Sequence, residues 1–206
     1  MSQCEQIESA LRDAAAQTVG TPPDVSAAAA AAGVLDVAYA TLESPVGELL
    51  LAATDEGLVR VAYLDHDEQA RIIEDLARRL SPRVLLAPRR LDETRRELDE
   101  YFAGGRSRFD LRLDWRLTRG FGRRVLEATA RIPYGAVSSY KQVATDAGSP
   151  RATRAAGNAL GANPLPIVVP CHRVLHSGGG LGGYTGGLDR KRTLLAVESG
   201  QRDLGV

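Results

Sequence analysis

The sequence predicts an α+β protein with two domains, in which strands and amphipathic helices come first and a group of short helices follows. Residues 34–64 alternate apolar and polar side chains between turn signals, as short strands do. Residues 68–105 contain two amphipathic helical patterns, and residues 118–162 contain three helices separated by proline and glycine. We therefore expect a tail at 1–33, an N-terminal α/β domain at 34–116, a C-terminal domain at 117–200 and a tail at 201–206.

The first segments of the chain predict a short helix with a linker, and then a strand meander. Helical spacing of apolar residues reaches only to residue 14, where TPPD and a run of alanines follow. VLDVAYATL (34–42) reads as a strand that ends at the turn signal SPVG. ELLLAATDEGLVRVAYL (48–64) reads as two more strands with a tight turn at 55–57.

Two helices are predicted after the strands. EQARIIEDLARRL (68–80) places Ile72, Ile73, Leu76 and Leu80 on one face. LDETRRELDEYFAGG (91–105) repeats the pattern and stops at glycine. The first half shows no constellation of reactive side chains.

The second half predicts three short helices that form a helix-turn-helix unit. GFGRRVLEATARI (120–132) stops at proline and glycine, and SSYKQVATDAG (138–148) has a serine N-cap. SPRATRAAGNALGANP (149–164) is predicted to have Ser149 as its N-cap and Pro150 in its first turn. Its small residues would let the backbone approach either a ligand or another helix, and both interpretations stay open.

Composition and charge favour a cytosolic protein with a basic second half. The formal net charge is zero, but residues 1–117 carry 14 arginines and 21 acidic residues (−7), and residues 118–206 carry 12 basic and 5 acidic residues (+7). A basic half suggests contact with a polyanion, although charge can also drift along a chain without function. No apolar stretch approaches the roughly 18–20 residues of a membrane helix. Cys4 and Cys171 form no disulfide framework, and with three histidines no metal-ligand spacing appears.

The segment PIVVPCHRVLHSGGG (166–180) contains the candidate nucleophile. Residues 165–169 read as a short apolar strand between prolines, with Cys171 and His172 just beyond its end. A free thiol has a pKa of about 8.5, so a nearby imidazole that takes its proton would raise the thiolate fraction. His172 would have to act across a bend or through a water. The dipeptide alone is weak evidence, because a lone Cys-His pair is more often structural than reactive.

The flanking motifs resemble a known family. IPYGAVSSYKQVA, PRATRAAGNALGANPLPIVVPCHRV, GGYTGGL and a last helix with Glu198 resemble the O6-alkylguanine-DNA alkyltransferase family, also called methylated-DNA–protein-cysteine S-methyltransferases. SPVGELLLAATDEGLVRVAYL is the best match in the first half, so the resemblance covers about residues 37–200. It implies a ribonuclease-H-like N-terminal domain and a winged helix-turn-helix C-terminal domain. Phe121-Gly122 and Leu126 depart from the family pattern, which has Phe-Gln and a tryptophan.

The resemblance implies a repair protein that flips O6-alkylguanine out of duplex DNA and transfers the alkyl group irreversibly to its own cysteine. It implies that Cys171 is the acceptor and that His172 acts as its base through a water. It also implies that Glu198 orients this histidine, that Asn163 braces the active-site turn, and that Tyr140 donates to guanine N3. The backbone of Cys171 and Val174 would read the guanine amino group, and the Thr185 amide, after Tyr184, would face O6.

The implied partner is double-stranded DNA, bound in the minor groove with little sequence preference. Arg154 would fill the space of the extruded base, and Arg151, Ala155, Gly157 and Asn158 would share its DNA-binding surface. No metal or cofactor is expected. We expect a monomer in the cytoplasm, and the sequence leaves open whether molecules cluster along DNA.

Three alternatives remain. A relative that binds the lesion without transfer would lack the acceptor cysteine, which is present here. A thiol hydrolase based on Cys171 and His172 would leave Tyr140 and the arginine-bearing helix unexplained. A helix-turn-helix regulator would be expected to carry an additional N-terminal metal-binding domain, as fused relatives do.

Overall fold

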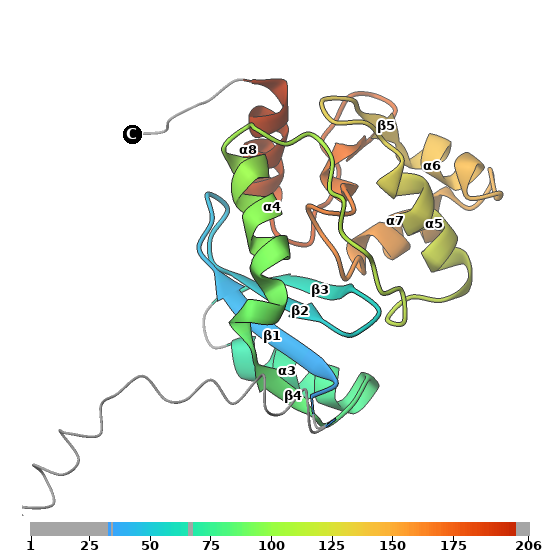
Figure 1. Ribbon diagram of the computed structural model, residues 1–206. Helices are drawn as coiled ribbons and strands as arrows, with labels where there is room; N and C mark the ends of the chain where they lie inside the picture. Colours follow the sequence, from blue (N-terminus) through green and yellow to red (C-terminus); the bar gives the residue numbers. More distant parts are fainter. Residues whose placement is uncertain (1–32, 34, 66–67, 201–206) are drawn as a thin grey trace, which may run out of the picture.

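A four-stranded sheet forms the centre of the first half (Figure 1). The computed structural model describes residues 33, 35–65 and 68–200. The strands are β1 (Val37–Leu42), β2 (Leu49–Ala53), β3 (Leu58–Tyr63) and β4 (Val84–Leu86), in the order β3-β2-β1-β4. β1, β2 and β3 are antiparallel neighbours and β4 runs parallel to β1, so the predicted meander is confirmed and β4 is an addition to it. The predicted N-terminal helix, most of its linker and the tail at 201–206 lie outside the described residues.

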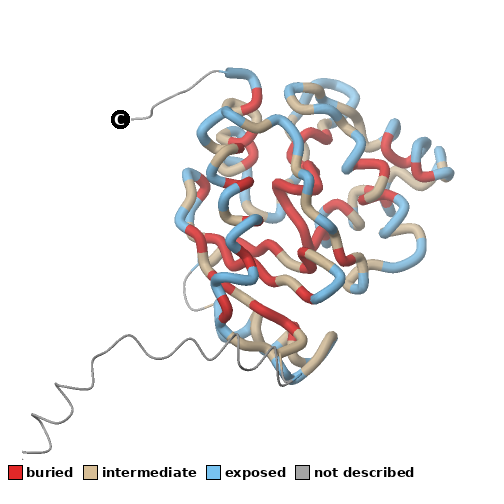
Figure 2. Tube along the Cα trace, viewed as in Figure 1, coloured by how far each residue is buried: buried red, intermediate tan, exposed pale blue. Residues whose placement is uncertain are grey.

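Both faces of this sheet are covered. α3 (Glu68–Arg79) packs Leu76 against Leu50 and Val59 on one face. The other face meets the turn η1 (Pro88–Leu91), the helix α4 (Asp92–Phe102) and the second half of the chain. A strand covered on both faces needs no polar alternation, which explains why the run LLLA of β2 is buried without a break (Figure 2).

The second half consists of four helices and a two-stranded ribbon. The helices are α5 (Gly120–Ala130), α6 (Tyr140–Asp146), α7 (Thr153–Gly161) and α8 (Leu188–Ser199), and the ribbon pairs β5 (Ser138–Ser139) with β6 (Val174–Leu175) in parallel. α5, α6 and α7 pack together, whereas α8 lies beside α4 of the first half (Figure 1). The predicted trio of helices is therefore confirmed. Within the described part of the chain, every helix is too short or too polar to cross a bilayer.

The predicted start of the third helix is wrong. The Gly148 amide donates to the Thr145 carbonyl and the Ser149 amide to the Ala144 carbonyl, with Gly148 in the left-handed region (φ 79°). This pair of bonds is a Schellman closure of α6, so Ser149 ends one helix and does not begin the next. α7 begins only at Thr153, and Arg151 lies in the preceding turn.

The predicted strand at 165–169 is also wrong. These residues form a buried turn in which the Val169 amide donates to the Leu165 carbonyl and Ile167 has φ 74°. Prolines at 164, 166 and 170 remove the amide donors that a strand would need. A β-branched residue in the left-handed region is strained, by about 1–3 kcal/mol, and here the strained turn leads directly to Cys171.

Candidate active site

The Cys171 thiol is held at the start of a tight turn below α7. Cys171 is 7% exposed and opens the 3-10 turn η2 (Cys171–Arg173). The Asn163 amide nitrogen donates to the Cys171 sulfur (3.2 Å) and to the Val169 carbonyl (2.9 Å), and its oxygen accepts from the Leu165 amide (3.0 Å). One side chain therefore fixes both ends of the strained turn and contacts the sulfur.

The environment of the thiol acts on its protonation in two directions. Burial raises the pKa of Cys171, whereas the Asn163 hydrogen bond and the charge of Lys191 lower it. Lys191 is fully buried on α8, and its ammonium donates to the carbonyls of Val174 (2.7 Å) and Leu181. Burial in turn lowers the pKa of Lys191. A buried ammonium that bonds neutral carbonyls favours a nearby thiolate.

His172 is fully buried and belongs to a cluster around Glu198. His172 Nε2 lies 2.8 Å from Glu198 Oε1, and Arg173 donates to both carboxylate oxygens at 2.8 Å. The Tyr101 hydroxyl donates from α4 to Glu198 Oε1 (2.7 Å), and the Gly135 amide donates to Oε2 (3.2 Å). Glu198 therefore receives donors from both halves of the chain.

The charges in this cluster fix the state of the histidine. Burial opposes ionisation of Glu198, but the hydrogen bonds from His172 and Arg173 outweigh it and bring its pKa to about 2. Burial lowers the pKa of His172, against the opposing effect of Glu198. A neutral imidazole beside a carboxylate keeps its proton on the nitrogen facing the carboxylate, here Nε2. Nδ1 is then a bare acceptor, and it is buried without a hydrogen-bond partner among the described residues.

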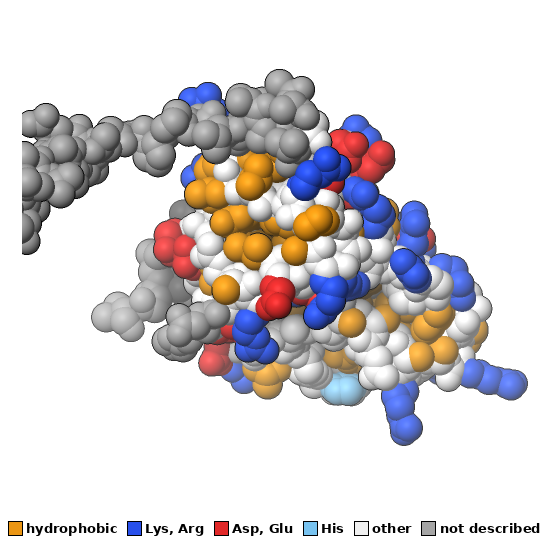
Figure 3. Space-filling model, turned by 90° about the horizontal axis from the view of Figure 1, so that it is seen from below, with side chains coloured by type: hydrophobic (Ala, Val, Ile, Leu, Met, Phe, Trp, Pro, Cys, Tyr) orange, Lys and Arg blue, Asp and Glu red, His pale blue; other side chains and the backbone are white. Residues whose placement is uncertain are grey.

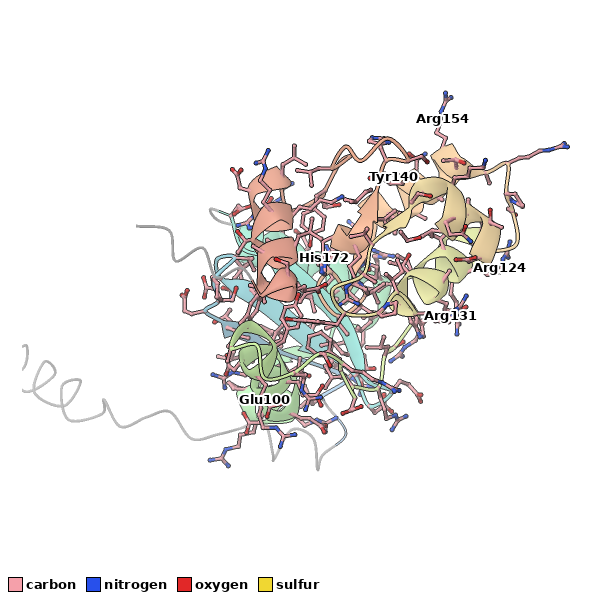
Figure 4. All side chains as sticks on the ribbon, turned by 90° about the horizontal axis from the view of Figure 1, so that it is seen from above. Glu100, Arg124, Arg131, Tyr140, Arg154 and His172 are labelled. Atoms are coloured by element: carbon pink, nitrogen blue, oxygen red, sulfur yellow. The ribbon has the colours of Figure 1, made fainter. Side chains whose placement is uncertain are left out.

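A cavity of about 710 Å³ connects the thiol to the surface of α7. Tyr140 begins α6, packs its ring against Gly157 and places its hydroxyl 3.4 Å from the Gly183 carbonyl. Burial, followed by the charge of Cys171, raises the pKa of Tyr140. Arg154 also lines the cavity, and its side chain projects outward from the end of the molecule (Figure 4). The cavity is therefore lined by an exposed arginine as well as by the buried Cys171.

The structure brings most of the sequence-predicted site residues around this cavity. Tyr184, Thr185, Asn158 and Gly157 line it with Cys171 and Tyr140. Thr185 donates its hydroxyl to the Gly161 carbonyl (2.6 Å), which ties the loop after Tyr184 to the end of α7. Val174 is buried, and its carbonyl already accepts from Lys191.

The surface of α7 is less uniform than its small residues suggest. Ala155 and Asn158 are exposed, whereas Ala156 is buried in the core, so the two interpretations of this helix apply to different faces. Arg151 is exposed but lies outside the helix and does not line the cavity. Figure 3 shows Lys and Arg side chains projecting from the end of the molecule that α5, α6 and α7 form.

Sequence reasoning missed four residues that build the site. Arg173 and Lys191 provide its buried cations, and Tyr101 and Tyr63 provide hydroxyls from the first half. Arg173 stands within the PCHRV motif and could have been found there. Lys191, Tyr101 and Tyr63 have no local sequence signal, and a tyrosine at a strand end or on an apolar helix face is typical of the core. Among the described residues, no three His, Cys, Asp or Glu side chains gather as metal ligands would.

Comparison with known proteins gives the same assignment along most of the described chain. The family model described as "6-O-methylguanine DNA methyltransferase, ribonuclease-like domain" matches residues 37–115. The model described as "6-O-methylguanine DNA methyltransferase, DNA binding domain" matches residues 120–200. The N-terminal half is thus ribonuclease-like and the C-terminal half is a DNA-binding domain.

Curated relatives and solved structures are similar over most of their length. A methylated-DNA–protein-cysteine methyltransferase of Mycolicibacterium paratuberculosis is 43% identical over 165 residues, which is 79% of this chain and 92% of that protein. The constitutive enzyme of that name from Bacillus subtilis is 37% identical over 78% of this chain and 94% of its own. The crystal structure of Mycobacterium tuberculosis O6-methylguanine methyltransferase has a TM-score of 0.69 at 37% identity, covering 82% of this chain and 96% of that one. The structure of Mycobacterium tuberculosis OGT in complex with DNA has a TM-score of 0.67 at 38% identity, covering 80% and 94%.

Proposed function

The chain belongs to the methylated-DNA–protein-cysteine methyltransferase family, and on that premise we propose how its residues carry out the transfer. It is a DNA repair protein that moves an alkyl group from DNA onto a cysteine of its own chain. We propose that this cysteine is Cys171. The observation that carries the proposal is that the buried sulfur accepts a hydrogen bond from Asn163 and lines the same cavity as Arg154.

The first proposed step is activation of the thiol. The proton of Cys171 passes through a water to Nδ1 of His172. A water is needed because the two side chains form no direct hydrogen bond, and Nδ1 can accept because it has no other hydrogen-bond partner among the described residues. Glu198 stabilises the imidazolium that results, while Arg173 balances the carboxylate in the resting state. Lys191 and the Asn163 amide stabilise the thiolate.

The second step is displacement at the alkyl carbon. The thiolate attacks that carbon, a C–S bond forms, the bond to guanine O6 breaks, and the electron pair leaves with the guanine. A soft and polarizable nucleophile suits displacement at carbon, which explains a cysteine rather than a serine. The departing guanine gains charge at O6 and N3, and donors placed there lower the barrier. We assign these donations to the Thr185 amide and the Tyr140 hydroxyl, and reading of the guanine amino group to the backbone of Cys171 and Val174.

Access to a base in duplex DNA requires its extrusion, at a cost of a few kcal/mol. We propose that α7 enters the minor groove with little sequence preference, and that Arg154 fills the space of the extruded base. Ala155, Gly157 and Asn158 would allow close approach, and Arg151 would contact the backbone from the turn before the helix. This assigns α5–α7 and the β5–β6 ribbon to a winged helix-turn-helix domain at 117–200, after a ribonuclease-H-like domain at 34–116. A monomer that acts in the cytoplasm completes the proposal.

The test uses duplex DNA that carries O6-methylguanine with a labelled methyl group. The wild-type protein should retain one label per chain, on the peptide that contains Cys171, as read by mass spectrometry. Cys171→Ser should keep its affinity for the duplex and lose transfer. Retention of transfer by this variant would refute Cys171 as the acceptor, and binding without any labelling of the wild type would favour a lesion-binding protein.

A further inference from the structure

A second cavity reaches the thiol from the side of the N-terminal half. It has a volume of about 500 Å³ and is lined by residues of β3 and α3 as well as by Cys171. Tyr184 and Thr185 line both this cavity and the one that opens at α7. The Tyr184 segment therefore separates two spaces that meet at the sulfur.

Tyr184 is held in this position by a residue of the N-terminal half. The hydroxyls of Tyr63, at the end of β3, and Tyr184 lie 2.6 Å apart, and the two rings meet edge to face with centroids 6.2 Å apart. Tyr184 is partly buried, so loss of this bond would leave its hydroxyl without this partner.

Tyr63 is itself clamped, so it can act as a fixed support. The guanidinium of Arg190 lies 4.5 Å from the centre of the Tyr63 ring, and Arg190 is in turn held by both oxygens of Asp65 and by the Val46 carbonyl. On the loop side, a Cβ atom added at Gly186 would lie 2.5 Å from the Tyr63 ring. Only glycine allows the loop after Tyr184 to pass this close.

The geometry of the transfer indicates what the second cavity would hold. In a displacement at carbon, sulfur, carbon and O6 must lie in line, so the remaining substituents of that carbon project sideways from the line. A methyl group needs no further room. A benzyl group, with guanine in the cavity beside Tyr140 and Arg154, needs space next to the sulfur on the other side of Tyr184.

We propose that Tyr63 determines which alkyl groups this protein accepts, by fixing Tyr184 as the wall between the guanine cavity and the cavity toward β3 and α3. The inference rests on the proposed transfer to Cys171. The occupant of the second cavity is the distal part of a bulky alkyl group. The hydroxyl of Tyr63 acts through Tyr184, so Tyr63 is a positioning residue that restricts substrate size, and its ring also lines the second cavity.

The experiment compares single-turnover transfer from duplexes that carry O6-methylguanine or O6-benzylguanine. Tyr63→Phe keeps the ring and removes the bond to Tyr184, so transfer of benzyl should become about threefold to tenfold faster, the range expected for one hydrogen bond, while transfer of methyl stays within about twofold. Tyr184→Phe should give the same change in the benzyl-to-methyl ratio. The double variant should match either single variant, because all three lack the same bond.

Tyr39→Phe is the matched control, since Tyr39 packs on the opposite face of the sheet. It should leave both rates unchanged, and thermal unfolding of each variant checks that the fold is intact. An unchanged or lower benzyl-to-methyl ratio in folded Tyr63→Phe and Tyr184→Phe would overturn the role of Tyr63. If the wild type failed to transfer methyl to Cys171, the proposed function itself would be at fault.

Discussion

The buried carboxylate of Glu198 accepts hydrogen bonds from His172, Arg173, Tyr101 and the Gly135 amide. Arg173 supplies the compensating positive charge, because guanidinium stays protonated at all ordinary pH. The imidazole therefore does not have to carry a proton in order to balance the carboxylate. This division of roles leaves His172 neutral and able to accept the proton of a thiol, although its neighbour is an anion.

Glu198→Gln tests this arrangement through the pH dependence of stability. The folded-state pKa of Glu198 is depressed to about 2 from 4.5, so its ionisation stabilises the fold above pH 4.5, and this contribution disappears as the pH falls toward 2. A depression of this size corresponds to about 3 kcal/mol. We expect the free energy of unfolding to be lower in the variant by about this amount at pH 7, and the difference from wild type to shrink below pH 4.5, in urea titrations.

Glu127→Gln is the matched control, because Glu127 forms a solvent-exposed pair with Arg123 on α5. Exposed pairs contribute about 0–1 kcal/mol, so its effect should be small at every pH. A stability difference between wild type and Glu198→Gln that stays constant from pH 7 to pH 2 would contradict the depressed pKa.

At the scale of elements, the first turn of α7 connects the cavity to the solvent. Arg154 stands in that turn and is exposed, whereas Ala156 anchors the opposite face in the core. The backbone of Arg154 is therefore held in place by the anchored helix, while its long side chain extends into the solvent. This suits a side chain that enters a space vacated by a base.

Arg154→Ala should separate base extrusion from chemistry. Repair of O6-methylguanine in a duplex should slow by about tenfold or more, because extrusion costs a few kcal/mol, while the reaction with free O6-benzylguanine should change little. Arg151→Ala is the control: this residue is exposed in the turn before α7, and its loss should weaken DNA affinity without changing that ratio of rates. Equal slowing of both reactions by Arg154→Ala would exclude the extrusion role.

The elements also show what the sequence can and cannot predict. The strands and helices with clear periodicity were predicted because local pattern and tertiary burial agree there, as in β1 and α3. The turn at 165–169 was not, since an apolar run between prolines lacks the signal that separates a strand from a buried turn. Ser149 was misassigned because a helix cap and a helix closure use the same residue types.

The candidate site divides in the same way. The PCHRV motif identifies Cys171 and its neighbours because they are adjacent in the chain. Tyr63 and Tyr101 reach the site only through the packing of the two halves, because Tyr63 and Tyr184 are 121 positions apart and Tyr101 and Glu198 are 97 positions apart. No local pattern encodes contacts at such separations.

At the scale of the whole molecule, charge is divided between the halves. The basic second half includes Lys141 on α6 and Arg151 in the turn before α7, and both are exposed. DNA affinity should therefore fall with salt, with a slope of about −0.9 per neutralised phosphate in a double-logarithmic plot. Lys141→Gln should make the slope shallower by about one contact, as measured by fluorescence anisotropy across a salt series.

Arg96→Gln is the control for this prediction. Arg96 is exposed on α4 of the acidic half, so removal of its charge should leave the slope unchanged. A slope that is flat in the wild type, or shifted equally by both variants, would place the phosphate contacts elsewhere.

The hydroxyl of Tyr101 reaches across from α4 to the carboxylate beside His172, and Tyr63 does the same for the loop that carries Tyr184. The half that lacks a reactive group of its own therefore completes the reaction centre of the other. A chimera assembled from the halves of two relatives would keep the Tyr101 bond to Glu198, and the Tyr63 bond that fixes Tyr184, only if both phenols were inherited with the second half. The two halves therefore have to be inherited together if both contacts are to be kept.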